Sequence, residues 1–377
     1  MSPRTGLPSA GAVGGAVASS RDPDLEALRQ TLLAEGIRDT DDPRASFGRG
    51  LPAAPTPRTS QLPPAILTLG GDGDYTLDHV LGEGGMATVW LAQQRALARE
   101  VAVKRAHSPT DGAARQLLHE AIITGQLEHP NIVPVHAVVR DAEGPAVIMK
   151  RIGGRSWDEL IDTRAPLERH LEVVLQVCQA CAFAHSRGVL HRDIKPDNVM
   201  IGDFGEVYLL DWGVARRLDD DSTNKLAGTP AYMAPEMVRG RSDVRSDVFL
   251  LGASLHQAVT GELRHHGAGM LETVAAAARC DEYAYAPEVP EELAAILTRA
   301  CAREPEARFQ TVNELRDALL RFREHRAASS LVITARARLQ QLEALARDPA
   351  QADYGRAQAL FTETRFAFEQ AREVWPE

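Results

Sequence analysis

The stretch HRDIKPDNVMIGDFGEVYLLDWG, residues 191–213, decides how the rest of this sequence is interpreted. It opens with a loop that carries a carboxylate, a cation and an amide, at Asp193, Lys195 and Asn198. A turn rich in Asp, Pro and Asn can have the same composition without any activity. A base, a cation and an amide able to bind a metal ion on one loop nevertheless favour a catalytic site over a plain turn.

The same stretch contains two Asp-aromatic-Gly triplets, which begin at Asp203 and at Asp211. By composition alone, either aspartate is a candidate metal ligand. The letters GDFG, residues 202–205, have the composition of a turn, and the EVYLL that follows reads as a strand. We therefore expect a strand hairpin between Val199 and Leu210.

Two features upstream of the loop point to phosphate binding. The segment LGEGGMATV, residues 81–89, lies between two predicted strands, and Gly82 and Gly84 would let the backbone approach a phosphate closely. Any hairpin turn can be rich in glycine, so this match alone is weak. The segment VAVK then places Lys104 in an apolar strand, where it needs an anionic partner such as Glu120 or must face water.

The pattern of strands and helices around these motifs indicates a two-lobed α+β unit. Five segments between Tyr75 and Arg151 read as strands, and residues 113–127 read as a helix. Leu167–Arg187 is a long amphipathic helix, and Gly188 stands where a C-terminal cap glycine belongs. A sheet-forming segment followed by a helical one predicts a small β-rich lobe, a larger helical lobe and a cleft between them.

The two flanks differ from this central unit. Residues 1–70 are rich in Ala, Gly, Pro, Ser and Arg, which predicts a disordered arm with one short helix at most, at Asp24–Glu35. Near the C-terminus, Leu331–Ala346 and Gln351–Val374 predict a helical hairpin that packs on the central unit or on a partner. An adaptor whose working part is this hairpin is one alternative function.

Bulk composition excludes some classes of partner. The 377 residues carry a net charge of −10, so we expect no overall attraction to nucleic acid or to an anionic membrane. No segment is long and apolar enough to predict a membrane span, and the start lacks the features of a signal peptide. Cys178 and Cys181 have C-x-x-C spacing, but their helical pattern favours core packing over a metal site. Reduced cysteines predict a cytoplasmic location.

Taken in order, these motifs resemble those of the protein kinases, specifically the bacterial eukaryote-like serine/threonine kinases. The resemblance covers roughly residues 75–323, and it also rests on Ala234-Pro235-Glu236, Asp247 and Arg308. It implies a bilobal protein-kinase fold. The expected domains are an arm at 1–70, a kinase domain at 75–325 and a helical extension at 327–377.

The resemblance also decides between the two triplets. In this family a strand hairpin separates the catalytic-loop Asn from the metal-binding Asp. Asp203 is only five residues past Asn198, which leaves room for one strand but no return. The literal DFG is therefore expected at the hairpin turn, and Asp211 of the DWG triplet is expected to face the cleft.

The resemblance implies transfer of the ATP γ-phosphoryl group to Ser/Thr hydroxyls of proteins, with Mg²⁺ or, as a substitute, Mn²⁺. Lys104, held by Glu120, would contact the α/β-phosphates. Asp193 would orient the acceptor hydroxyl and take its proton, with Lys195 near the γ-phosphoryl group. The metal ligands would be Asn198 and Asp211, and the nucleotide-binding positions would be Leu81, Gly82, Glu83, Gly84, Gly85, Val89, Lys104, Met149 and Ile152.

Several further expectations come from the same resemblance. Thr229 should lie near Asp193 and Lys195 as part of the acceptor platform, and Glu236 should form a structural ion pair with Arg308. Arg192 would meet an anion on the activation loop, either phosphorylated Ser222 or Thr223 or the aspartates at 219–221. Autophosphorylation would involve self-association. The main alternative is a pseudokinase scaffold that binds nucleotide and partners without turnover.

Overall fold

The computed structural model describes residues 74–83, 87–107, 111–141, 143–220, 226–347 and 353–375, together with residues 30, 40, 42, 44 and 45. The chain divides into two compact units, Met1–Asp39 and Thr40–Glu377, and the second is the subject below. Apart from Gln30, the helix expected at Asp24–Glu35 lies outside the described residues.

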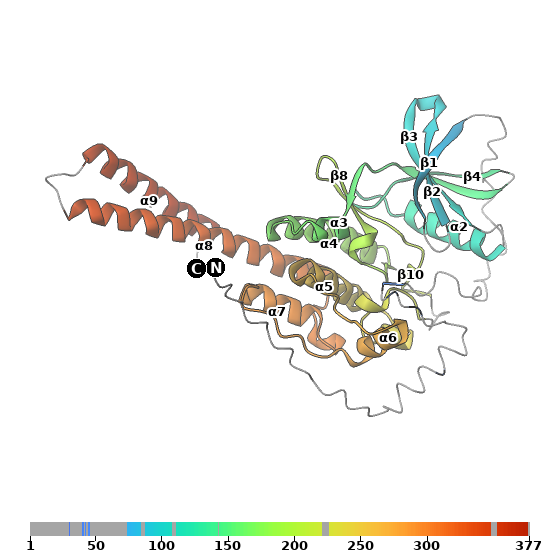
Figure 1. The fold of residues 1–377 in the computed structure, drawn as a ribbon. Coiled ribbons are helices and arrows are strands. Elements are labelled where there is room, and N and C mark those ends of the chain that lie inside the picture. Colours follow the sequence, from blue (N-terminus) through green and yellow to red (C-terminus); the bar gives the residue numbers. More distant parts are fainter. Residues whose placement is uncertain are drawn as a thin grey trace, which may run out of the picture. The chain divides into compact units, whose positions relative to one another are not determined.

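The small lobe is built on an antiparallel sheet of five strands in the order β1-β2-β3-β5-β4 (Figure 1). Alternation along the third strand places Val101 and Val103 in one apolar layer with Ile148, while Lys104 lines the opposite side. A helix packs Leu117 on the sheet. The elements are β1 (Tyr75–Glu83), β2 (Ala87–Gln94), β3 (Arg99–Ala106), α2 (Asp111–Gly125), β4 (Val135–Asp141) and β5 (Gly144–Lys150).

The helical lobe follows, as expected from the sequence. The helix α4 (Leu167–Ser186) contains Cys178 and Cys181 as free, buried thiols, which confirms core packing. Gly188 has a φ of 72° just past the end of this helix, so the predicted cap glycine is confirmed. The helices are α3 (Trp157–Asp162), α4 (Leu167–Ser186), α5 (Val244–Thr260), α6 (Met270–Arg279) and α7 (Glu291–Ala300).

The predicted strand hairpin is present between β8 (Val199–Gly202) and β9 (Val207–Leu209), with β6 (Gly154–Ser156) as a third strand. Phe204 is 97% exposed at the turn, and Gly205 has a φ of 89°, a conformation that glycine adopts readily. The literal DFG triplet is therefore a turn between two strands.

The C-terminal region differs from the expectation at one point. A separate helix was expected from Leu331, but α8 (Val312–Ala346) is one continuous helix of 35 residues. It passes without a break through the domain boundary expected at residues 325–327. α9 (Tyr354–Val374) packs on α8 to form the predicted hairpin (Figure 1).

The hairpin packs mainly through small residues, and the phenylalanines of α9 are exposed. The buried positions include Ala328 and Ala335 on α8 and Ala367 on α9, whereas Phe361 and Phe368 are exposed. Small side chains at helical spacing let two helix backbones approach closely. Among the helices that the structure describes, none combines the length and apolar character needed to span a bilayer.

Candidate active site

A cavity of about 400 Å³ lies between the five-stranded sheet, α2 and the β8–β9 hairpin. Gly84 and Gly85 fall outside the described residues. Every other residue predicted to bind nucleotide or metal lines this cavity, as does Glu120. They are Leu81, Gly82, Glu83, Val89, Lys104, Met149, Ile152, Asn198 and Asp211.

Much of the cavity wall is apolar and was not predicted residue by residue. Ala102, Val147, Met200 and Leu210 contribute to this wall. Strand alternation could have found Ala102, because it lies two residues before Lys104 and shares its face. The others come from different elements, which only the folded chain brings together. An apolar wall with a few charged groups at one end suits a flat aromatic ring that carries an anionic tail.

Lys104 forms the charged end of the cavity. Its ammonium Nζ lies 2.5 Å from Glu120 Oε1 and 3.9 Å from Asp211 Oδ1. All three side chains are largely shielded from water, which strengthens the attraction between them. The pairing of Lys104 with Glu120, expected from the sequence, is confirmed, and it joins β3 to α2.

Asp211 reaches the cavity because the backbone turns sharply at this residue. Its φ is 60°, a left-handed conformation that Asp tolerates better than most residues, and its Oδ1 accepts from the Gly213 N–H at 3.4 Å. The next residue, Trp212, is fully buried and meets the ring of His191 edge to face at 4.5 Å. Trp212 thereby holds the DWG triplet against the loop of residues 191–198.

The loop of residues 191–198 brings together its three predicted side chains, Asp193, Lys195 and Asn198. Asn198 Nδ2 donates to the carbonyl of Asp193 at 2.7 Å and to its Oδ2 at 3.2 Å. Thr229 Oγ1 donates to Asp193 Oδ1 at 2.7 Å and accepts from Lys195 Nζ at 2.9 Å. All four residues are buried, so these hydrogen bonds form away from competing water.

Gly228 allows Thr229 to reach this position. Its φ is 109°, and a Cβ there would lie 2.5 Å from the carbonyl oxygen of Arg192. No side chain fits at that distance. The glycine is therefore required for the close approach of the two loops.

Asp247 on α5 anchors the backbone of this loop. Its carboxylate accepts from the backbone N–H groups of His191 and Arg192, both at 2.9 Å, and from His185 Nε2 at 2.7 Å. Burial alone would raise the pKa of Asp247, but these hydrogen bonds outweigh it and the pKa lies below its ordinary value. A buried carboxylate thus holds the backbone on which Asp193 is placed.

His191 links the loop to the strand that ends at Asp211. Its Nε2 donates to the carbonyl of Leu210 at 3.0 Å, and its Nδ1 accepts from the Asp193 N–H at 3.2 Å. Burial lowers the pKa of His191, which keeps the ring neutral with the single proton that this pattern requires.

Several other charged residues have defined partners. The guanidinium of Arg308, fully buried, donates to both carboxylate oxygens of Glu236 at 2.8 Å, so the structural ion pair is confirmed. Lys150, which also lines the cavity, lies over the ring of Tyr208, 4.6 Å from its centroid, and the exposed Arg151 pairs with Glu100 at 3.4 Å.

Arg192 and Arg216 lie close together. Burial, followed by the like charge of Arg216, lowers the pKa of Arg192 to about 10. Both side chains donate to Ser242. Arg192 donates to the Ser242 hydroxyl, and Arg216 donates to the Ser242 backbone carbonyl. Two neighbouring cations of this kind favour a nearby anion. Ser222 and Thr223, the predicted modification sites, lie outside the described residues.

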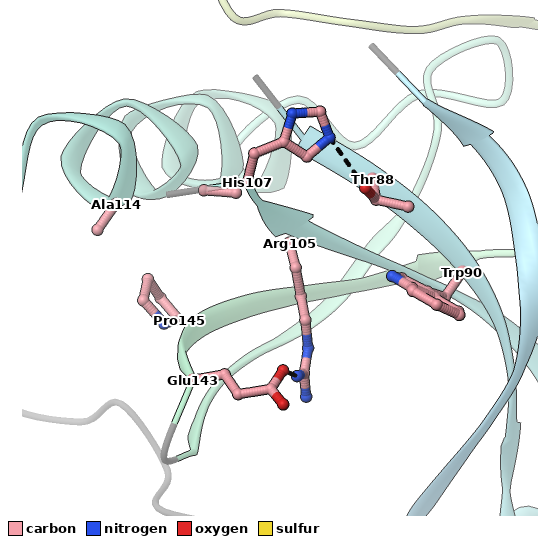
Figure 2. Close-up of a pocket in the computed structure, with 8 residues that line it drawn as sticks. Thr88, Trp90, Arg105, His107, Ala114, Glu143 and Pro145 are labelled. Atoms are coloured by element: carbon pink, nitrogen blue, oxygen red, sulfur yellow. Dashed lines mark hydrogen bonds and ion pairs between the residues drawn. The ribbon is translucent and has the colours of Figure 1, made fainter. Parts of the chain in front are cut away.

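A second, smaller hollow of about 260 Å³ lies on the small lobe (Figure 2). Two of its polar groups are engaged within the hollow, because His107 Nε2 contacts Thr88 Oγ1 at 2.9 Å and Arg105 pairs with Glu143. It therefore lacks the convergence of charged groups seen in the larger cavity.

Comparison with known proteins agrees with this geometry. A family model for the protein kinase domain matches residues 75–319. The chain is 36% identical over 266 residues to the serine/threonine-protein kinase PknB of Mycobacterium tuberculosis, covering 66% of this chain and 42% of that protein. It is 32% identical over 290 residues to the serine/threonine-protein kinase PknD of Chlamydia trachomatis, covering 65% and 31%. The chain thus spans less than half the length of these curated relatives.

Proposed function

The chain belongs to the protein kinase family, and on that basis we propose that it transfers the γ-phosphoryl group of ATP to Ser and Thr hydroxyls of proteins. The observation that carries this proposal is the convergence of Lys104, Asn198 and Asp211 on one cavity, with Asp193 hydrogen-bonded to Asn198 beside it. The apolar wall would hold the adenine ring. Lys104, kept in place by Glu120, would bind the phosphates.

The donor set at the cavity suits a hard divalent cation such as Mg²⁺, with Mn²⁺ as a substitute. Asp211 supplies carboxylate oxygens, and Asn198 uses its amide nitrogen toward Asp193, which leaves its carbonyl oxygen as the ligand atom. A bound cation would neutralise charge on the phosphates as it develops during transfer. In the proposal, Asp211 and Asn198 hold that cation.

Thr229 supports the role proposed for Asp193. A threonine hydroxyl already sits between Asp193 Oδ1 and Lys195 Nζ, donating to the first and accepting from the second. An acceptor hydroxyl has the same hydrogen-bonding needs. We infer that Asp193 orients it and accepts its proton, a contribution of about 10²–10⁴-fold, while Lys195 lies near the phosphoryl group.

The alternative of a pseudokinase scaffold predicts binding without turnover. The test is incubation of the full chain with Mg²⁺, radiolabelled ATP and myelin basic protein, with Asp193→Asn as the matched control. Label on substrate or on the chain itself, lost in Asp193→Asn, supports the kinase. Equal label with both proteins would remove the role assigned to Asp193, and no label with either would favour the scaffold.

Regulation by autophosphorylation is a further part of the proposal. Phosphate on Ser222 or Thr223 would add about −1.5 to −2 charge opposite Arg192 and Arg216. The aspartates at 219–221 are the rival source of that charge, although Asp219 is engaged by Arg217 at 3.3 Å. Activity that survives complete dephosphorylation would favour the aspartates. We also propose that the chain associates with itself during this reaction. Its cysteine usage supports a cytoplasmic location.

A further inference from the structure

One side of the α8–α9 hairpin carries large apolar side chains that remain exposed in the part of the chain that the structure describes. Tyr354, Phe361 and Phe368 are spaced seven residues apart along α9, and their exposed fractions are 79%, 57% and 37%. Leu339 on α8 is exposed as well. A step of seven residues returns to nearly the same side of a helix, so the three aromatic residues form one stripe.

A contact between the two helices shows that the stripe continues onto α8. The ring of Trp375 stacks on that of His325 at 5.0 Å, and α9 runs antiparallel to α8, because Glu363 pairs further along with Arg338. Steps of seven residues from the stacked pair lead to Val332 and Leu339 on α8 and to Phe368, Phe361 and Tyr354 on α9. We call these five residues the aromatic side of the hairpin.

Two charged residues of α8 lie on the same side. Arg336 and Glu343 are exposed, and they follow His325 by 11 and 18 residues, which are close to three and five full helical turns. They therefore point in the direction of His325, beside Val332 and Leu339. The aromatic side thus has an apolar row on α9 and a positive and a negative charge on α8.

The pattern of this surface indicates that it binds other helices. Apolar residues at seven-residue spacing are typical of helices that pack nearly parallel or antiparallel to a neighbour. The exposed parts of the three aromatic residues amount to roughly 350 Å² per chain. A stable dimer buries about 800 Å² on each partner, so these side chains would supply close to half, and the residues around them the rest.

The order of the charges fits a second copy of the same surface. If two aromatic sides pack antiparallel about the level of Leu339 and Phe361, Arg336 of each copy lies against the partner's Glu343. Tyr354 of each copy then meets the partner's Phe368. Parallel packing would instead bring Arg336 near the partner's Arg365, because residue 365 on α9 is level with residue 336 on α8, and like charges would repel.

We propose that the aromatic side is a homodimer interface in which two hairpins form an antiparallel four-helix bundle. The two kinase domains then lie at opposite ends of the bundle. This dimer is therefore distinct from the encounter proposed for autophosphorylation, and it does not depend on the proposed kinase function.

Sedimentation equilibrium of the full chain over a dilution series tests the interface. Phe361→Glu should raise the dissociation constant of the dimer about 100-fold or more, because the two-fold axis makes each loss count twice. Phe366→Glu is the matched control, since Phe366 is equally exposed at 62% but lies five residues on, toward a different side of α9. This variant should dimerise as the unchanged chain does.

A charge exchange tests the antiparallel arrangement. Arg336→Glu places like charges together at two positions of the dimer, so we expect its dissociation constant to rise about tenfold. Adding Glu343→Arg to this variant should restore the affinity of the unchanged chain. A dimer that Arg336→Glu tightens, or that the second substitution does not restore, would contradict the arrangement.

Cross-linking supplies a readout at a single position. The four cysteines are free and buried, so a cysteine added on the surface has no exposed competitor. Phe361→Cys lies close to the two-fold axis and should form a disulfide-linked dimer on mild oxidation, whereas Phe366→Cys should not.

Two results would overturn the proposal. One is a chain that stays monomeric at every concentration, which would leave the aromatic side to a helix of a different protein. The other is an equal response of Phe361→Glu and Phe366→Glu. Because these readouts are masses and cross-links, a chain without phosphotransfer would contradict the kinase proposal and leave the dimer standing.

Discussion

Asp211 Oδ1 lies 3.9 Å from the ammonium of Lys104, and Asp203 lies at an exposed turn at the other end of the β9 strand. The two charged groups come from different lobes of the fold, one from β3 and one from the residue that follows the β8–β9 hairpin. Their approach creates the polar end of the cavity. Lys104 and Asp211 are therefore the pair through which the proposed reaction is tested most simply.

Replacement of Glu120 tests how Lys104 is held. Glu120→Gln removes the charge that fixes the ammonium 2.5 Å away, so we expect kcat/KM for ATP to fall about tenfold or more. Lys104→Arg should lower it about 100-fold, because a planar guanidinium does not replace a compact ammonium. Glu128→Gln, at an exposed position just past α2, is the matched control. Equal rates for Glu120→Gln and Glu128→Gln would contradict the positioning role.

The buried ion pair between Glu236 and Arg308 should contribute to stability. Glu236→Gln leaves the guanidinium of Arg308 buried without its charged partner, which we expect to reduce the free energy of unfolding by about 3–5 kcal/mol. Urea denaturation measures this change. Glu306→Gln is the control, because Glu306 pairs with Arg245 at a largely exposed position and should change stability by at most about 1 kcal/mol. Similar losses from both variants would contradict the assignment.

Stability should decrease as the pH falls below 6.5, in part through His265. Burial, with the nearby charge of Arg264, lowers the pKa of His265 to about 3. Between that value and 6.5 the unfolded chain binds a proton that the folded chain does not, so stability rises with pH across this window. At pH 4.5, His265 should therefore lower the free energy of unfolding by on the order of 2 kcal/mol relative to pH 7.

Denaturation of His265→Gln and His266→Gln at pH 7 and pH 4.5 checks this prediction. Because His265→Gln has no imidazole to protonate at this position, its loss of stability between the two pH values should be smaller than that of the unchanged chain. His266 is exposed, and its replacement should leave the difference as it was. A pH dependence that His265→Gln does not alter would contradict the assignment.

Much of the site could be predicted because its residues are fixed by short local patterns. The turn composition of GDFG predicted the hairpin turn, and the resemblance to the protein kinases, in which a strand hairpin separates the two metal-binding residues, then selected Asp211 as the residue that reaches the cavity. Alternation in β3 likewise places Lys104 on the side of Ala102. For Lys104 the local chain geometry determines the position, whereas for Asp211 the order of the family's motifs was needed as well.

Other features depend on contacts between distant segments and give little local signal. The continuity of α8 past residue 325 is stabilised by α9, which covers Ala335, and a plain helical pattern does not show where a domain ends. The docking of Arg44 needs Asp158, which lies on α3, far along the chain. A single arginine in a proline-rich arm carries no sign of that contact.

The most direct test of the account compares Asp211→Asn with Asp203→Asn, two identical substitutions in the two Asp-aromatic-Gly triplets. The measurement is phosphotransfer from ATP as the Mg²⁺ concentration is varied. The account predicts that Asp211→Asn lowers the rate about 100-fold or more at every Mg²⁺ concentration, while Asp203→Asn responds as the unchanged chain does. A rate lost with Asp203→Asn and kept with Asp211→Asn would contradict it.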